Sequence, residues 1–211
     1  MENSGKLEIG DILLNSIGEE VEIVSLSVDV GEYTVYHILN VTDTYNYFAE
    51  DILVHNVSFR DCFVPGTLIT LGNGDVKPIE DIQIGDEVLS YNEETNKTEV
   101  KKVISTNSPI HNDIVTYSFS NGATLSCTFD HPIYTSEHKL KSFSPDKTNH
   151  IYNLNSTVDN IQEGDSVFNV NGYTYNIESI NTDDSRAIQT YIFTVEDNHN
   201  FYANGILVHN K

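Results

Sequence analysis

Alternating apolar and polar positions are the main pattern along this chain, and they predict short β-strands. Turns rich in Gly and Asn separate such runs, which occupy residues 67–71, 113–120, 123–129, 173–180 and 189–196. No segment has the apolar spacing of an amphipathic helix, and the polar stretch 137–156 is expected to be a loop. The pattern therefore predicts an all-β fold.

An internal repeat divides the chain into two parts. Residues 7–56 align without gaps on residues 161–210, with 17 identities in 50 positions, and both segments end in ILVHN. A shorter echo relates residues 79–92 to 158–171, so that the element apolar-x-x-Gly-Asp occurs three times. Gly-Asp is a turn dipeptide, and the alternating apolar residues after it suit a strand that leaves the turn.

Charge and composition narrow the function classes. The net charge of −21 comes from 32 acidic residues spread along the chain, which disfavours nucleic acid as a partner. There is no run of 18 apolar residues and no signal-peptide pattern at the N-terminus, so we expect no membrane span and a cytoplasmic location, or a place within an unknown host protein. Two cysteines without a CxxC pair make a structural metal site improbable, and we expect no cofactor and no small-molecule substrate.

Three sequence blocks resemble those of Hint domains, the family of inteins, bacterial intein-like domains and hedgehog autoprocessing domains. The stretch from Cys62, beginning CFVPGT, is similar to the N-terminal block, and CTFDHPIYT at 127–135 resembles the T-x-x-H block. Residues 191–210, which end in His-Asn, are similar to the C-terminal blocks. The resemblance implies a horseshoe-like, pseudo-two-fold Hint fold over residues 62–211, with no room for a homing endonuclease.

At the N-terminal end, the chemistry of a self-cleaving chain fits the residues present. A Cys thiol is the best side-chain nucleophile for the preceding carbonyl, so Cys62 can convert the amide after Asp61 into a thioester. The resemblance implies that His131 and Thr128 assist this N-to-S acyl shift by handling the proton and polarising the bond. Alone, a His before Pro at a strand end would be a turn residue.

At the C-terminal end, Asn210 can attack its own backbone carbonyl, form a succinimide and break the bond to Lys211. His209 lies next to that carbonyl in sequence. The resemblance implies that His199 also assists the cyclisation, although a His in the sequence NHN could equally be a turn residue. The expected partners of the reaction are the flanking segments of the chain itself.

Three departures from the splicing pattern favour cleavage over ligation. Lys211 follows Asn210, where splicing inteins have a Cys, Ser or Thr acceptor, and a protonated amine is a poor acceptor. Ile192 occupies the position where the family often has an Asp that couples the two ends. Asp61 precedes the nucleophile, and its carboxylate can attack the thioester.

Cys127 adjoins Thr128 and admits three interpretations. The simplest is a small buried apolar residue on a strand. A disulfide with Cys62 would make processing depend on redox conditions, and a shared zinc site is the third alternative.

Residues 1–61 are interpreted as a partial second Hint C-terminal half, residues 7–56, followed by a short linker. This half ends in His55-Asn56 but has Tyr45 where the full unit has His199, and Val57 follows the Asn. Two roles stay open. The segment is either a folded remnant of a tandem unit or a competitor of residues 161–210 for the same N-terminal half.

Two functions from different classes fit the sequence. The first is a single-turnover enzyme that cleaves or splices its own chain at the 61/62 and 210/211 bonds. The second is a degenerate, non-catalytic Hint repeat that acts as a structural module of a larger host protein. A cysteine protease acting on other proteins is poorly supported, because no acid is placed to orient a Cys-His pair.

Overall fold

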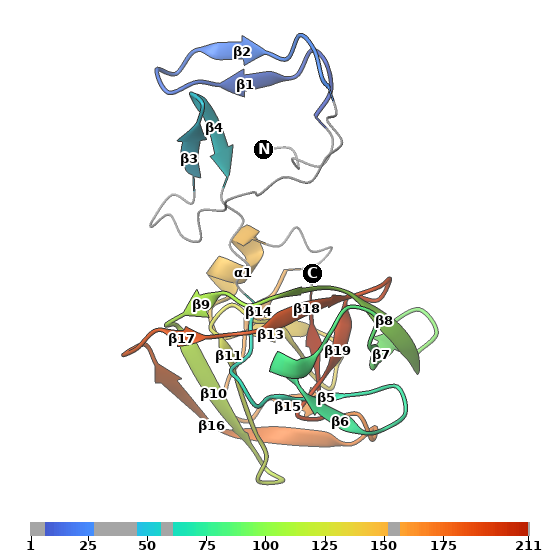
Figure 1. Cartoon of the computed structure of the whole chain (residues 1–211). Coiled ribbons are helices and arrows are strands. Elements are labelled where there is room, and N and C mark those ends of the chain that lie inside the picture. Colours follow the sequence, from blue (N-terminus) through green and yellow to red (C-terminus); the bar gives the residue numbers. More distant parts are fainter. Residues whose placement is uncertain (1–6, 28–45, 56–60, 152–156, 211) are drawn as a thin grey trace. The chain divides into compact units, whose positions relative to one another are not determined.

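The computed structural model describes residues 7–27, 46–55, 61–151 and 157–210, and the chain forms two compact units, Met1–Ser58 and Phe59–Lys211 (Figure 1). Four positions named in the sequence predictions lie outside the described residues, namely Tyr45, Asn56, Val57 and Lys211.

The larger unit is built from strands, as the alternating pattern predicts. A 3-10 turn spans Ile79–Asp81, and one short α-helix, α1, spans Pro145–Ile151. The strands are β5 (Leu68–Thr70), β6 (Val76–Pro78), β7 (Glu87–Asn92), β8 (Lys97–Asn107), β9 (Ile110–His111), β10 (Ile114–Phe119), β11 (Thr124–Thr128), β12 (Ile133–Tyr134), β13 (Leu140–Ser142), β14 (Asp159–Asn160), β15 (Ser166–Phe168), β16 (Thr174–Asp183), β17 (Ile188–Gln189), β18 (Ile192–Val195), β19 (Asn200–Ala203) and β20 (Ile206–His209).

Residues from both ends of the larger unit meet in one seven-stranded sheet with the order β14-β13-β12-β20-β19-β5-β6. In this sheet the last hairpin, β19-β20, lies between β5 and β12, and Ala203 pairs with Ile69 while Val208 pairs with Ile133. The remaining strands form the sheets β11-β10-β16-β15 and β18-β8-β7 and the pair β17-β9. The C-terminal hairpin is thus inserted between strands of the N-terminal half.

The apolar side chains that the alternation selects form a large core and a smaller second cluster around Tyr202. Phe63, Tyr117, Phe119, Phe193 and Phe201 are all at most 1% exposed. Phe193 and Phe201 have ring centroids 4.1 Å apart, which ties β18 to β19. Burial of large aromatic side chains is a major source of stability in a small β-protein.

The predicted Gly-Asp turns recur with the same geometry. In each copy the Asp carboxylate accepts a hydrogen bond of 2.8 Å from the backbone N–H three residues earlier, that of Glu8, Gln83 or Gln162. The Gly before each Asp has a positive φ of 90° to 99°. Such a backbone is strained for residues with a Cβ, which explains why glycine stands at this position.

The stretch 137–156 departs from the loop prediction. It contains β13 and the helix α1, while residues 152–156 lie outside the described part of the chain. A buried hydroxyl attaches this polar helix to the preceding turn, because Thr148 Oγ1 donates to the backbone carbonyl of Asp130 at 2.9 Å. The prediction was wrong because this tertiary hydrogen bond leaves no apolar periodicity in the sequence.

The smaller unit contains four short strands in two hairpins, β1 (Ile12–Leu14) with β2 (Glu20–Glu22) and β3 (Asn46–Ala49) with β4 (Ile52–His55). The hairpins are joined by a β-bridge between Asn15 and Ile52 and by a hydrogen bond of 3.3 Å from the Ser16 N–H to the Asp51 carboxylate. Large apolar side chains stay exposed here, with Ile17 at 75% and Phe48 at 48%. Among the residues that the structure describes, no helix is long and apolar enough to cross a membrane.

Candidate functional site

Cys62 belongs to the core of the larger unit and has no exposed surface. The residue after it fixes its position, because the N–H and carbonyl of Phe63 each form a 2.9 Å hydrogen bond with the backbone of Tyr191. Burial raises the pKa of the Cys62 thiol well above its usual value, and the nearby Asp61 raises it further, while the Thr190 hydroxyl opposes the shift. The thiol is therefore protonated at rest.

Thr128 contacts the nitrogen of the Asp61–Cys62 peptide bond. Its Oγ1 accepts a hydrogen bond of 3.1 Å from the Cys62 N–H, and its own N–H donates to the Cys62 carbonyl at 2.9 Å. This side chain is fully buried at the end of β11. The structure thus brings Thr128 to the predicted scissile bond, where a hydroxyl can pass a proton to the departing nitrogen.

His131 is fully buried, three residues after Thr128, and neither of its ring nitrogens has a hydrogen-bond partner among the described residues. A short turn fixes its position, since its N–H donates to the Thr128 carbonyl at 3.1 Å and its ring lies 4.1 Å from that of Phe63. Burial lowers the pKa of His131 to about 3, and the neighbouring His209 lowers it further, whereas backbone groups of Asp61 and His209 oppose the shift. The imidazole is therefore neutral at pH 7.

The C-terminal residues are placed by the β19-β20 hairpin. Its turn, Asn204-Gly205, has φ values of 48° and 77°, the left-handed pair that a tight two-residue hairpin requires. His209 donates its backbone N–H to the carbonyl of Pro132 at 3.0 Å, next to His131. The residues predicted to act at the two scissile bonds thereby lie close together, just before the start of β12.

Asn210 and His209 are arranged around the predicted second scissile carbonyl. His209 Nδ1 is 2.7 Å from the Asn210 backbone oxygen. The buried Asn210 side chain donates from Nδ2 to the Phe193 carbonyl at 2.5 Å. An imidazole N–H at that distance polarises the carbonyl, and the second contact fixes the orientation of the carboxamide that would attack it.

His199 enters this arrangement through its backbone. Its carbonyl accepts a 2.8 Å hydrogen bond from the Asn210 N–H, while its side chain is exposed and its φ is 51°. The structure therefore does not bring the His199 ring to the Asn210 carbonyl, and a role for that ring stays a prediction.

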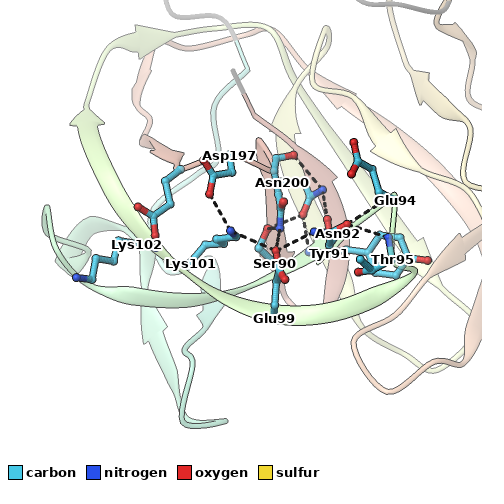
Figure 2. A network of polar contacts seen from close by, with 12 residues as sticks. Ser90, Tyr91, Asn92, Glu94, Thr95, Glu99, Lys101, Lys102, Asp197 and Asn200 are labelled. Carbon is cyan, nitrogen blue, oxygen red and sulfur yellow. Dashed lines mark hydrogen bonds and ion pairs between the residues drawn. The ribbon is translucent and has the colours of Figure 1, made fainter.

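The following residue, Asn200, is the buried member of this segment and was missed by the sequence analysis. Its Oδ1 accepts hydrogen bonds from the Tyr91 N–H at 2.7 Å and the Ser90 hydroxyl at 2.9 Å, and its Nδ2 donates to the Tyr91 carbonyl at 2.8 Å (Figure 2). This network attaches the start of β19 to β7. Because Asn200 is paired with His209 in the hairpin, the attachment also positions the residues next to the predicted second scissile bond.

Asp130 is a further buried group that sequence reasoning missed. It is 1% exposed, and neither carboxylate oxygen has a hydrogen-bond partner among the described residues. Burial raises the pKa of Asp130 to about 6, nearby Asp113 raises it further, and the Thr128 hydroxyl opposes the shift. Its place between Thr128 and His131 was the only sequence signal, since burial of that position cannot be read from a T-x-x-H pattern.

Asp130 leads to a testable dependence of stability on pH. The Asp130 pKa of about 6 lies above the ordinary value of 3.8, so the folded state holds a proton that the unfolded state has lost between these values. Stability from this group is therefore lost as the pH rises from about 4 to 6. We expect Asp130→Asn to raise the free energy of unfolding by about 2 to 3 kcal/mol at pH 7.5 and by little at pH 3.5.

Denaturant unfolding at both pH values, with the exposed Asp184→Asn as the matched control, measures this difference. An Asp130→Asn variant that gains no stability at pH 7.5 would show that the carboxyl is ionised in a compensated environment.

The other predicted neighbours are also located. Cys127 is fully buried and pairs with Val115 on β10, and neither cysteine forms a disulfide. This arrangement agrees with the interpretation of Cys127 as a small core residue. Ile192 is 4% exposed and packs in the same core. An apolar side chain there offers no proton relay between the two ends.

Comparisons with known proteins agree with this geometry. A family model described as a pretoxin HINT domain matches residues 68–211. No curated protein matches the chain. Among solved structures, the chain is similar to a bacterial intein-like domain from Clostridium thermocellum, with 26% identity, a TM-score of 0.59, and coverage of 71% of this chain and 98% of that one.

Two inteins share the fold at lower identity. The gp41-1 intein is 22% identical with a TM-score of 0.55, and the match covers 71% of this chain and 98% of that one. A DnaB intein from Synechocystis sp. PCC 6803 is 22% identical with a TM-score of 0.52, and the match covers 72% of this chain and 99% of that one.

Proposed function

The chain belongs to the pretoxin HINT domain family, in agreement with the predicted resemblance to Hint domains, and we propose that residues 62–210 cut their own chain at both ends. The family is one of self-processing domains, and the Hint fold is all-β, as the structure is. The observation that carries the proposal is the meeting of the two ends around His131. The His131 N–H donates to the carbonyl of Thr128, whose hydroxyl accepts from the Cys62 N–H. The carbonyl of the next residue, Pro132, accepts from the His209 N–H. One imidazole there serves a site that includes both scissile bonds.

The proposed first step breaks the bond between Asp61 and Cys62. Cys62 Sγ attacks the Asp61 carbonyl carbon, the C–N bond breaks, and a thioester forms. The thiol proton ends on the freed Cys62 nitrogen, so no net proton is consumed. A neutral His131 can relay this proton without becoming an imidazolium, because one ring nitrogen accepts while the other N–H donates. Thr128 contacts the accepting nitrogen at 3.1 Å.

The proposed fate of the thioester is hydrolysis. Water attacks the thioester carbonyl, which gives a carboxylate at Asp61 and regenerates the Cys62 thiol. The neighbouring Asp61 side chain, only 4% exposed, is near enough to the Cys62 thiol to raise the pKa of that thiol. We infer that ligation is a minor outcome, because the residue after Asn210 is a lysine and not a hydroxyl or thiol nucleophile.

The proposed second reaction breaks the bond after Asn210. Asn210 Nδ2 attacks its own backbone carbonyl carbon, the bond to the next nitrogen breaks, that nitrogen takes the proton, and Asn210 becomes a succinimide. His209 Nδ1, 2.7 Å from the oxygen, supports the developing negative charge there. The pretoxin description of the family agrees with a domain that releases the segment following it from a precursor.

Trapping the thioester tests the first reaction directly. In an excess of a small thiol such as 2-mercaptoethanesulfonate, we expect a fragment of residues 1–61 that carries the mass of the added thiol at its C-terminus. Cys62→Ala should abolish this product, whereas the matched Cys127→Ala should retain it, because Cys127 adjoins the site without touching the scissile bond. Mass spectrometry distinguishes the outcomes, and a thiol adduct formed equally by Cys62→Ala would contradict the assignment of the nucleophile.

A further inference from the structure

Over the residues that the structure describes, the smaller unit reproduces four strands of the C-terminal half of the larger one. Shifted by the repeat distance, β1, β2, β3 and β4 begin at the first residues of β15, β16, β19 and β20. The register of each hairpin is also the same. Even the isolated bridge between Asn15 and Ile52 recurs, as Asn169 with Ile206. The two segments therefore share one local structure and not only a sequence pattern.

Positions that are covered in the larger unit are open in the smaller one. Phe48 is 48% exposed, whereas its counterpart Tyr202 has no exposed surface. Leu7 is 45% exposed, and its counterpart Ile161 is 2% exposed. In the larger unit, residues of the N-terminal half supply the cover, for example Tyr91 and Tyr134 around Tyr202. The smaller unit thus presents an apolar surface, and the larger unit shows which residues pack against the corresponding surface of residues 161–210.

A polar atom on the same hairpin also lacks its partner. Asn46 Oδ1 is buried and has no hydrogen bond among the described residues. Its counterpart, Asn200 Oδ1, accepts from the Tyr91 N–H at 2.7 Å and from the Ser90 hydroxyl at 2.9 Å (Figure 2). An unpaired buried carbonyl oxygen costs free energy that a donor from a strand like β7 would recover. This observation is independent of apolar exposure, and it indicates the same kind of partner, one that has a strand like β7.

We propose that this repeat face, formed by Leu7, Asn46, Phe48, Ala49 and Val54, binds the N-terminal half of a Hint domain. The partner is a polypeptide with strands equivalent to β5, β7 and β12 that is not already paired with a C-terminal half. Ala49 and Val54 correspond to Ala203 and Val208, which pair with Ile69 on β5 and Ile133 on β12. Two strands of the partner thus extend the β3-β4 hairpin on both edges.

The N-terminal half of the same chain is held more firmly by residues 161–210. Asn204 Oδ1 accepts from the Leu68 N–H and its Nδ2 donates to the Thr124 carbonyl, both at 2.8 Å. Glu50 occupies the position of Asn204 in the smaller unit, and a carboxylate cannot donate the second of these bonds. The repeat face is therefore suited to a separate, unoccupied N-terminal half and not to displacing its own twin.

A capture experiment tests the proposal without relying on processing. The full chain carries Cys62→Ala and Asn210→Ala, so that it stays uncut, and the probe is a tagged polypeptide of residues 62–157 of this same sequence. We expect an equimolar complex. Phe48→Asp should weaken it roughly tenfold or more, since a charge would replace a central apolar contact. The matched control Ile17→Asp should change it less than twofold, because Ile17 corresponds to the exposed Asn171.

A second variant tests whether the effect of Phe48→Asp comes from the lost contact or from unfolding of the smaller unit. Asn46→Leu removes an oxygen that has no hydrogen bond within the described residues of the smaller unit, so no bond of that oxygen is lost from the free unit. The change should still weaken capture several-fold, because the partner loses an acceptor. Binding of the probe to a separate polypeptide of residues 158–211 shows that the probe is competent to bind a C-terminal half. A probe that binds this polypeptide but not the full chain overturns the proposal, and so does a complex that Phe48→Asp and Asn46→Leu leave unchanged.

Discussion

Asn210→Ala is expected to abolish release of the segment after residue 210 while cleavage before Cys62 continues. The carboxamide is the proposed nucleophile, and alanine has no atom that can close the succinimide ring. The remaining contacts of the strand end are backbone contacts, such as the 2.8 Å hydrogen bond to the His199 carbonyl, and they survive the change. Loss of a nucleophile lowers the rate by about three orders of magnitude or more.

The measurement is the time course of C-terminal release, followed by intact mass on a chain with a folded segment added after Lys211. Asn56→Ala is the matched control, because Asn56 ends the same ILVHN sequence in the first repeat. We expect this control to release the segment at the rate of the unchanged chain. Release by Asn210→Ala at a comparable rate would mean that ordinary hydrolysis, and not side-chain attack, breaks the bond.

His131→Asn is expected to slow cleavage before Cys62 by about a hundred- to ten-thousandfold, the usual contribution of a general acid–base. The same change should stabilise the protein in acid. The pKa of His131 falls from the ordinary 6.5 to about 3 in the folded state, so the unfolded state binds a proton first as the pH drops. Stability from the neutral imidazole is thus present above pH 6.5 and lost below it.

At pH 4.5 this linkage costs the unchanged protein about 3 kcal/mol that the variant does not lose. Cleavage rates by mass spectrometry and unfolding at pH 4.5 and 7.5 measure the two effects. His138→Asn is the matched control, because His138 is exposed and its φ of 58° suits asparagine. Unchanged cleavage by His131→Asn would remove this residue from the mechanism, whatever its effect on stability.

The sequence was sufficient to predict the fold, for identifiable reasons, and it also named the residues of the proposed chemistry, whose roles stay predictions. Alternating polarity and Gly-Asp turns are local signals, and they specify strands and hairpins. Cys62, Thr128, His131, His209 and Asn210 lie in blocks whose order and spacing are specific. The structure brings these five residues together through β12 and β20.

The groups that were missed owe their roles to burial and tertiary contact. Asp130 is made unusual by the core around it, and Asn200 by its hydrogen bonds to β7, neither of which leaves a periodic pattern. The helix α1 depends on the hydroxyl of Thr148 in the same way. The exposed ring of His199 shows the converse, because a residue in the expected block reached the site only with its backbone.

The most direct test of self-processing is the intact mass of residues 1–211 placed between two unrelated folded domains, with a thiol reductant present. The account predicts fragments that end at Asp61 and at Asn210, with the first absent from Cys62→Ala and the second absent from Asn210→Ala. A full-length mass that persists unchanged in all three chains would contradict the account and leave the domain as a non-catalytic structural module.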